Sequence, residues 1–218
     1  MTRPGPRTAL LAGATGLVGS HLLEQLLLDG HWDKVITVGR RPTDRAAPQL
    51  EQLVVPFPEI GELPAVDDVF SCLGTTIKVA GSQDAFRAVD HDAVVALATQ
   101  AARSGAQQFL HVTALGASAG SRIFYNRVKG ETERDVAAVG LPTTIAFRPS
   151  MIDGRRADES RPGESLGLLA MRTVGPLLGK YRPNKASDIA AAMIREAKVG
   201  STGHRVVEAG HFGRDLAD

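Results

Sequence analysis

The sequence predicts an α/β fold: a doubly wound, mainly parallel β-sheet with helices on both faces. Short β-rich runs alternate with helical segments, the order expected of parallel strands joined by crossover helices. The first run, Thr8–Ala12, leads directly into a glycine-rich turn and then into a helical apolar pattern over Leu17–Leu28. A length of 218 residues suits a single domain over 1–218 with a small C-terminal lobe, and 43% hydrophobic residues support a core.

The later elements are placed by β-branched runs, apolar helical patterns and helix-ending residues. Lys34–Val38 is rich in Val, Ile and Thr, which favours a second strand. Gly105 closes a helix rich in Ala, Val and Leu, and Gly140 with Pro142 closes the next one. Further strands are expected at Gln52–Val55, Val69–Leu73, Gln108–Thr113, Thr143–Phe147 and Arg205–Glu208, and helices at His91–Ser104 and Asn126–Val139.

The segment Met151–Lys185 differs from this alternating pattern, because arginine, proline and glycine precede an apolar stretch, Leu166–Leu178. It follows the sixth strand, and ligands of doubly wound folds bind beyond the carboxyl ends of the strands. We interpret 151–185 as a lid or small substrate lobe; a surface insertion that touches no ligand is the alternative. Its arginines could bind an anionic substrate group or stay solvated: Arg155, Arg156 and Arg161, with Arg148 as an earlier neighbour.

Charge and cysteine content limit the partners and the compartment. The chain has 25 Lys and Arg against 24 Asp and Glu, whereas a nucleic-acid-binding protein usually shows a basic excess. Cys72 is its one cysteine, so an internal disulfide is excluded and a reducing compartment is expected. The sequence shows no signal-peptide core and no apolar run long enough to span a membrane. We expect a cytoplasmic protein with a small-molecule substrate; a homodimer is compatible with the sequence.

The glycine-rich turn predicts a dinucleotide site. Gly13, Gly16 and Gly19 follow the first strand in the spacing G-x-x-G-x-x-G and open the first helix. Glycines let the backbone turn tightly and approach a pyrophosphate, and the helix N-terminus offers unpaired N–H groups. A glycine turn without a ligand is the alternative reading.

The residues after the second strand favour NADP(H) over NAD(H). An Asp or Glu at this position would hydrogen-bond the ribose 2′-hydroxyl of NAD. The sequence instead reads Gly39-Arg40-Arg41-Pro42, and no acid occurs until Asp44. Two guanidinium groups could pair with a 2′-phosphate. The alternative is that one or both arginines are solvated loop charges, and for Arg41 alone the two interpretations are about equal.

A Y-x-x-x-K pattern predicts hydride chemistry. Tyr125 and Lys129 lie four residues apart at the start of a predicted helix, so both can face one pocket. A nearby ammonium favours the phenolate form of tyrosine, which can then exchange a proton with a carbonyl or alcohol. Without further context, an ordinary exposed helix pair is the more common explanation of this pattern.

Several motifs together resemble those of the short-chain dehydrogenase/reductase superfamily. They are Gly13–Gly19, Cys72-Leu73-Gly74-Thr75-Thr76, Tyr125–Glu131, Phe147-Arg148-Pro149 and Glu159–Glu164, in the family's order and over nearly the full length. The chain is most similar to the small atypical members, the Tat-interacting-protein-like NAD(P)H-binding reductases and their bacterial relatives. The resemblance implies a Rossmann-type fold and an NADP(H)-dependent oxidoreductase.

The resemblance also implies roles for individual residues. The cofactor pyrophosphate would bind the loop of Gly13, Thr15, Gly16, Leu17, Val18 and Gly19, and the adenosine phosphate would bind Arg40 and Arg41. The riboses would lie beside the turn after the fourth strand, Leu73, Gly74 and Thr75, and Lys129 would bind the nicotinamide ribose. The carboxamide would meet the backbone after the sixth strand, at Pro149 and Ser150. Tyr125 and Lys129 match the catalytic pair.

One departure from the family pattern concerns the end of the fifth strand. The superfamily places a hydroxyl residue there, often two serines, to hold the substrate carbonyl. Ala114 occupies the second serine position and cannot donate a hydrogen bond, so Thr113 is the expected substitute and Ser118 a more distant candidate. An NADPH-dependent carbonyl reductase is therefore expected, with a non-catalytic NADP(H)-binding regulatory or redox-sensing protein as the alternative. A nucleotide-sugar epimerase or dehydratase is disfavoured, because only about seventy residues follow the sixth strand.

The remaining reactive side chains are given no catalytic role. Cys72 lacks a local partner that would activate it and is interpreted as a small residue packed at a strand end. The six histidines show no metal-ligand spacing, so no metal site is expected.

Overall fold

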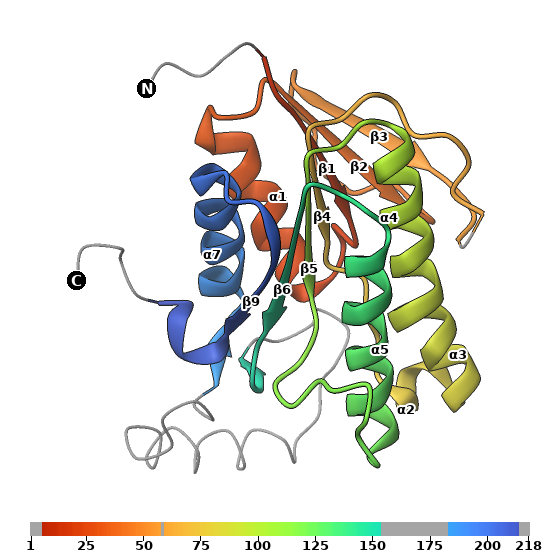
Figure 1. Ribbon diagram of the computed structural model, residues 1–218. Coiled ribbons are helices and arrows are strands. Elements are labelled where there is room, and N and C mark those ends of the chain that lie inside the picture. Colours follow the sequence, from red (N-terminus) through yellow and green to blue (C-terminus); the bar gives the residue numbers. More distant parts are fainter. Residues whose placement is uncertain (1–5, 58, 154–182, 214–218) are drawn as a thin grey trace.

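A computed structural model describes residues 6–57, 59–153 and 183–213, and it confirms the α/β fold (Figure 1). The main sheet has seven strands in the order β3-β2-β1-β4-β5-β6-β9, and every neighbouring pair is parallel. The strands are β1 (Thr8–Ala12), β2 (Lys34–Gly39), β3 (Leu50–Val54), β4 (Asp68–Ser71), β5 (Gln108–Val112), β6 (Thr143–Arg148) and β9 (Gly203–Glu208). The strand order reverses between β1 and β4, which is where doubly wound sheets bind nucleotides.

Helices cover both faces of the sheet (Figure 1). One face carries α1 (Leu17–Asp29) and α7 (Ala186–Val199), which pack side by side. The other carries α4 (Ala93–Arg103) and α5 (Phe124–Ala138), together with the short α2 (Ile77–Ala80) and α3 (Gln83–Arg87). A π-helical turn, η1 (Ala88–Asp92), joins α3 to α4, and a 3₁₀ turn, η4 (Ala209–His211), follows β9.

Successive side chains of the central strands alternate between two cores. Phe70 packs with α1 and α7, whereas its neighbour Val69 packs beneath α4 and α5. Both are fully buried, so the strand is apolar throughout rather than alternating with polar residues. Because both faces of these strands are buried, the strands occur in the sequence as short continuous apolar runs.

The structure differs from the expected elements at several boundaries. The helical stretch expected to begin at His91 begins at Gln83 and passes through the wider η1 turn before α4. Helix α7 was not expected; its Ala-rich face packs against α1, and Gly200, at φ 65°, ends it. Helix α5 begins at Phe124, two residues earlier than expected, which brings Tyr125 into the helix.

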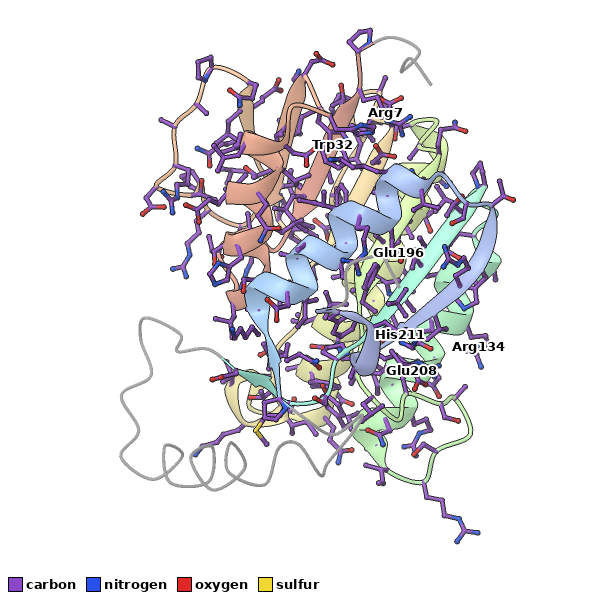
Figure 2. The ribbon with its side chains drawn as sticks, turned by 90° about the vertical axis from the view of Figure 1, so that its left-hand side faces the viewer. Arg7, Trp32, Arg134, Glu196, Glu208 and His211 are labelled. Carbon is purple, nitrogen blue, oxygen red and sulfur yellow. The ribbon has the colours of Figure 1, made fainter. Side chains whose placement is uncertain are left out.

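The amino-terminal edge of the sheet is held together by one buried carboxylate. Asp68 accepts hydrogen bonds from Arg7 Nε at 3.0 Å, from Trp32 Nε1 at 2.7 Å and from Gln108 Nε2 at 3.0 Å. Figure 2 shows Arg7 and Trp32 close together at this edge. Burial lowers the pKa of Arg7, but the bond and charge of Asp68 outweigh it and raise the pKa. This network occupies one edge, and the opposite, carboxyl-terminal edge carries the glycine-rich turn.

The expected lid falls largely outside the described part of the chain, since 154–182 are not described. Arg155, Arg156, Arg161 and the Glu159–Glu164 motif lie in this stretch. Described residues on either side of this stretch form a short parallel pair, β7 (Ile152–Asp153) with β8 (Asn184–Lys185). Among the described residues, no helix combines the length and apolar character that a membrane span requires.

Candidate cofactor and reduction site

The glycine-rich turn between β1 and α1 is too tightly packed for side chains. Gly13 adopts φ +81°, and a Cβ atom there would lie 2.6 Å from the carbonyl carbon and oxygen of Cys72. The Gly16 amide donates to the Gly13 carbonyl at 2.9 Å, and a Cβ on Gly19 would collide with that same carbonyl. The glycine spacing therefore reflects a backbone-on-backbone approach between β1, α1 and the end of β4.

The N-terminus of α1 is suited to bind a pyrophosphate. No described side chain caps this 13-residue helix at its N-cap residue Gly16, and its first turn contains no acidic residue. The first N–H groups of the helix therefore point toward the site with the positive end of the helix dipole. The backbone cradle and the uncapped helix fit the dinucleotide that the sequence predicts.

A cavity of about 550 Å³ runs along the carboxyl-terminal edge of the sheet from this turn. The predicted cofactor residues that line it are Gly13, Thr15, Gly16, Arg40, Arg41, Leu73 and Gly74. Leu17, Val18 and Gly19 do not line it; Val18 and Gly19 are buried under the turn, where they pack α1 onto the sheet. Ala88, Val89 and Ala93 close the cavity from the other side and were not foreseen.

The far end of the cavity carries positive charge. Arg40 and Arg41 line it and are exposed, and none of the described lining residues bears a carboxylate. Gln52 on β3 holds the loop in place, because its Oε1 accepts from the Thr43 amide at 2.7 Å and from the Thr43 hydroxyl at 3.0 Å. Asp44, the nearest acid in the sequence, is exposed and does not line the cavity.

Tyr125 and Lys129 share a face of α5 close to the turn after β4. The Tyr125 ring packs against Phe86, with ring centroids 5.3 Å apart. Lys129 is 5% exposed, and its Nζ lies 2.7 Å from Oδ1 of Asp90, which is 1% exposed. Burial lowers the pKa of Lys129, but the charges of Asp90 and Tyr125 outweigh it, so the net shift is upward and the side chain stays protonated.

Asp90 is a residue of this site that the sequence prediction missed. It lies on η1 directly before the expected start of the helix at His91, and its Oδ2 accepts the Thr75 amide at 2.8 Å. A signal was present, because Asp90 lies at helical spacing between the buried Phe86 and the buried Val94, on an otherwise apolar helix face. Burial of a carboxylate at such a position requires a partner, and Lys129 provides one.

Thr113 does not offer its hydroxyl to the cavity, contrary to the expectation that it orients the substrate. The hydroxyl lies 2.6 Å from Glu133 Oε1 and 3.2 Å from the Phe147 carbonyl, and the side chain is buried. Arg148 pairs with the same carboxylate, with its Nε 3.0 Å from Oε1. The physical reason is that Glu133, one turn beyond Lys129 on α5, needs donors in a buried position.

The other predicted residues take structural contacts. The Pro149 carbonyl accepts the Leu115 amide at 2.7 Å, and the Ser150 amide and hydroxyl both bond Asn184 Oδ1, at 2.9 and 3.0 Å. Ser118 is exposed and its backbone packs directly over Gly130, where a Cβ would collide with it.

Cys72 follows β4, packs against the core while only partly buried, and lines the cavity. Burial raises the pKa of its thiol to about 12, which disfavours the reactive thiolate near neutral pH. Among the described residues, no group of three or more His, Cys, Asp or Glu side chains could hold a metal ion.

The fold, the glycine cradle and the cavity at the reversal of strand order together define a nucleotide-binding oxidoreductase-like protein. Residues 9–116 match the NAD dependent epimerase/dehydratase family. Among the curated relatives, Protein fmp52, mitochondrial, of Emericella nidulans is 34% identical over 188 residues. The match covers 82% of this chain and 80% of the relative. Protein FMP52, mitochondrial, of Eremothecium gossypii is 37% identical over 153 residues, with 68% and 67% covered. The chain belongs to the family of these Fmp52 proteins, within the short-chain dehydrogenase/reductase superfamily.

Solved structures agree on the fold. UDP-N-acetylglucosamine 4-epimerase from Bacillus cereus superposes with a TM-score of 0.70 at 16% identity, covering 93% of this chain and 78% of that one. MoeE5 in complex with UDP-glucuronic acid and NAD gives a TM-score of 0.70 at 18% identity, with 93% and 76% covered. At 16% and 18% identity, these likenesses show the fold alone.

The expectation of a cytoplasmic protein is contradicted by the curated relatives, which carry the designation mitochondrial. The prediction rested on a single cysteine and on the lack of an apolar leader. Neither feature separates the cytoplasm from another compartment in which thiols stay reduced, so the inference went further than the chemistry allows.

Proposed function

We propose that the protein is an NADPH-dependent reductase of the short-chain dehydrogenase/reductase type that acts on a small carbonyl substrate. The observation that carries the proposal is the buried, protonated Lys129 on the same helix face as Tyr125, beside the Leu73–Thr75 turn. A tyrosine and a lysine in this relation can deliver a proton to a carbonyl oxygen as it is reduced.

Each residue has a part in this reaction. NADPH, held along the cavity by the glycine-rich turn, would supply the hydride that the carbonyl carbon accepts. Tyr125 donates its phenolic proton to the carbonyl oxygen, and Lys129 stabilises the phenolate that remains and binds the nicotinamide ribose. Arg40 and Arg41 pair with the 2′-phosphate of the adenosine, which the acid-free end of the cavity accommodates.

A second function is favoured by one specific observation. Ala114 has no hydroxyl, and the Thr113 hydroxyl is bound to Glu133, so the expected donor to a substrate carbonyl is missing from the end of β5. A non-catalytic protein that binds NADP(H) and reports on the nicotinamide pool needs no such donor.

Titration of NADPH and NADH, followed by a carbonyl panel monitored at the nicotinamide absorbance, distinguishes these functions. The panel includes a UDP-sugar, because the structural neighbours include epimerases. The reductase proposal expects turnover that Tyr125→Phe reduces at least about a hundredfold while NADPH affinity is kept, since general acid catalysis contributes on that order. Lys129→Met should lose both turnover and affinity, whereas Lys78→Met, at an exposed lysine of α2, should lose neither.

The outcomes separate cleanly. Tight NADPH binding without turnover of any panel member supports the sensor. Turnover that survives Tyr125→Phe contradicts the catalytic assignment, and preferential binding of NADH contradicts the reading of Arg40 and Arg41.

A further inference from the structure

The side chain of Gln52 ties the loop after β2 back onto β3, which is an edge strand of the sheet (Figure 1). Its Oε1 accepts the Thr43 amide at 2.7 Å and the Thr43 hydroxyl at 3.0 Å. Its Nε2 donates to the Arg45 carbonyl at 3.1 Å. One neutral amide therefore bonds three groups of a loop that is exposed over most of its length.

This tie comes directly after the two arginines of the cavity. Gly39, the last residue of β2, is held in the ladder with β3. Arg40 and Arg41 therefore stand between one anchor at Gly39 and a second anchor at Thr43. The remaining residue between them is Pro42, whose ring fixes φ. A stretch of three residues that is fixed at both ends has few conformations to lose when a ligand binds.

Gln52 is also part of the cavity wall. It lines the cavity together with Thr43, Arg40 and Arg41. A glutamate at this position could accept the same two hydrogen bonds from Thr43. It would, however, place a negative charge on a wall where none of the described lining residues carries a carboxylate.

Stability alone explains this arrangement poorly. Gln52 and Thr43 are both partly exposed, so water competes for their hydrogen bonds and the net contribution to stability is small. What the bonds do supply is a defined path for the backbone that carries Arg40 and Arg41.

We propose that Gln52 determines the specificity of the cavity for a nucleotide that carries a 2′-phosphate. It holds the loop of Arg40 and Arg41 in the conformation that accepts the phosphate, and it keeps this part of the wall uncharged. Gln52 is a positioning residue, because it acts through the two arginines. The inference rests on the proposed function for the identity of the nucleotide, NADPH, but it needs no hydride transfer.

The first measurement is the affinity for NADPH and for NADH, read by nicotinamide fluorescence at pH 7.5 and one fixed ionic strength. The two nucleotides differ only in the 2′-phosphate, so the ratio of their dissociation constants reports the contribution of that group. Gln52→Glu should reduce the preference for NADPH at least about tenfold, because its carboxylate repels the phosphate. Gln52→Leu should reduce it about threefold to tenfold, because an untied loop must be ordered on binding.

The matched control is Gln49→Glu, which adds the same charge just before β3. The Gln49 side chain donates to the Leu27 carbonyl at 2.9 Å and does not line the cavity. Its variant should keep the preference for NADPH within about twofold of the wild type, because solvent and salt screen the added charge. If the Gln52 variants lose affinity for both nucleotides by the same factor, Gln52 has only a structural role and the proposal is wrong.

The second measurement is the hydrogen-exchange rate of the Thr43 amide in the apo protein, by nuclear magnetic resonance. Gln52→Glu keeps the acceptor, so the Thr43 amide should stay as protected as in the wild type. Gln52→Leu removes the acceptor, and exchange should become at least about threefold faster. Equal rates in the wild type and in Gln52→Leu would show that the tie is not formed in solution, and would overturn the positioning role whatever the affinities.

Failure of this inference and failure of the proposed function give different results. If no carbonyl is turned over, the reductase proposal fails, while the preference for NADPH and its dependence on Gln52 are still measured. If the wild type prefers NADPH and the Gln52 variants keep that preference, this inference alone is wrong. If the wild type binds NADPH no more tightly than NADH, the assignment of NADPH and this inference are both wrong.

Discussion

The hydroxyl of Thr113, at the end of β5, lies 2.6 Å from Oε1 of Glu133 in the middle of α5. Glu133 is 4% exposed and also pairs with Arg148 at the end of β6. Three elements that surround the reduction site are therefore held together by one carboxylate. The contact gives the Thr113 hydroxyl a structural partner at the position that was expected to orient the substrate carbonyl.

Thr113→Val should destabilise the protein by about 1–3 kcal/mol, because it leaves Glu133 short of a buried donor. Thr113→Ser keeps the hydroxyl and should recover most of that loss. NADPH affinity should not change in either variant. Urea denaturation at neutral pH measures the first effect, with Thr202→Val at an exposed position as the control. A stable Thr113→Val protein that has lost only turnover would restore the substrate-orienting role.

Gly19→Ala should abolish measurable NADPH binding. A Cβ at Gly19 would collide with the Gly13 carbonyl, so α1 must move away from the turn whose N–H groups are directed at the pyrophosphate. Overpacking of this kind costs about 1–3 kcal/mol of stability, so the variant should still fold. Gly210→Ala is the matched control, since a Cβ there meets nothing within 4 Å. Equal NADPH affinity in both variants would contradict the assignment of the cradle.

Arg40→Ala should weaken NADPH binding by about tenfold to a hundredfold and leave NADH binding nearly unchanged. A charged hydrogen bond to a 2′-phosphate contributes on the order of 1.5–3 kcal/mol, and NADH has no such group. Arg41→Ala should show a smaller loss if both guanidinium groups share the phosphate. Arg45→Ala removes an exposed charge from the same loop that does not line the cavity, and it controls for the general electrostatic attraction. Equal losses for NADH and NADPH would indicate that Arg40 contacts another part of the cofactor.

The fold was predictable where local chemistry dictates it. β1 begins and ends at the expected residues, because an apolar run is followed at once by a glycine that must take φ +81°. Helix α7 was missed although it buries an Ala-rich face, since its stabilisation comes from α1, far away in the sequence. The η1 turn was missed for a related reason: its width is set by contact with Thr132 on α5, and no residue within the turn signals it.

The site was predictable in its backbone parts and less so in its side-chain parts. Gly13 and Gly19 are required because a Cβ atom at either position would collide with a backbone carbonyl, so their glycines follow directly from the close backbone packing. Thr113 and Asp90 could not be assigned in this way. Their partners, Glu133 and Lys129, lie 20 and 39 positions further along the chain. These contacts form only when the fold buries the polar groups together, so local sequence does not indicate them.

The buried imidazole of His111 is expected to make the folded protein less stable in acid. It lies on β5 opposite Ser71 of β4, is 1% exposed, and neither ring nitrogen has a hydrogen-bond partner among the described residues. Burial, with smaller contributions from the positive charges of Lys129 and His204, lowers the pKa of His111 from 6.5 to about 3. The imidazole is therefore neutral in the folded protein and protonated in the unfolded chain across this interval.

The folded state then loses stability as the pH falls below about 6.5, because only the unfolded chain takes up the proton. At pH 5 the loss from His111 alone should be on the order of 2 kcal/mol. His111→Leu removes both the proton site and two unpaired nitrogens, so it should match or exceed wild-type stability at pH 7 and flatten the decline toward pH 5. The exposed His211→Gln should retain the wild-type slope. Urea midpoints measured at half-unit pH steps test this; parallel slopes for His111→Leu and the wild type would place the acid-sensitive group elsewhere.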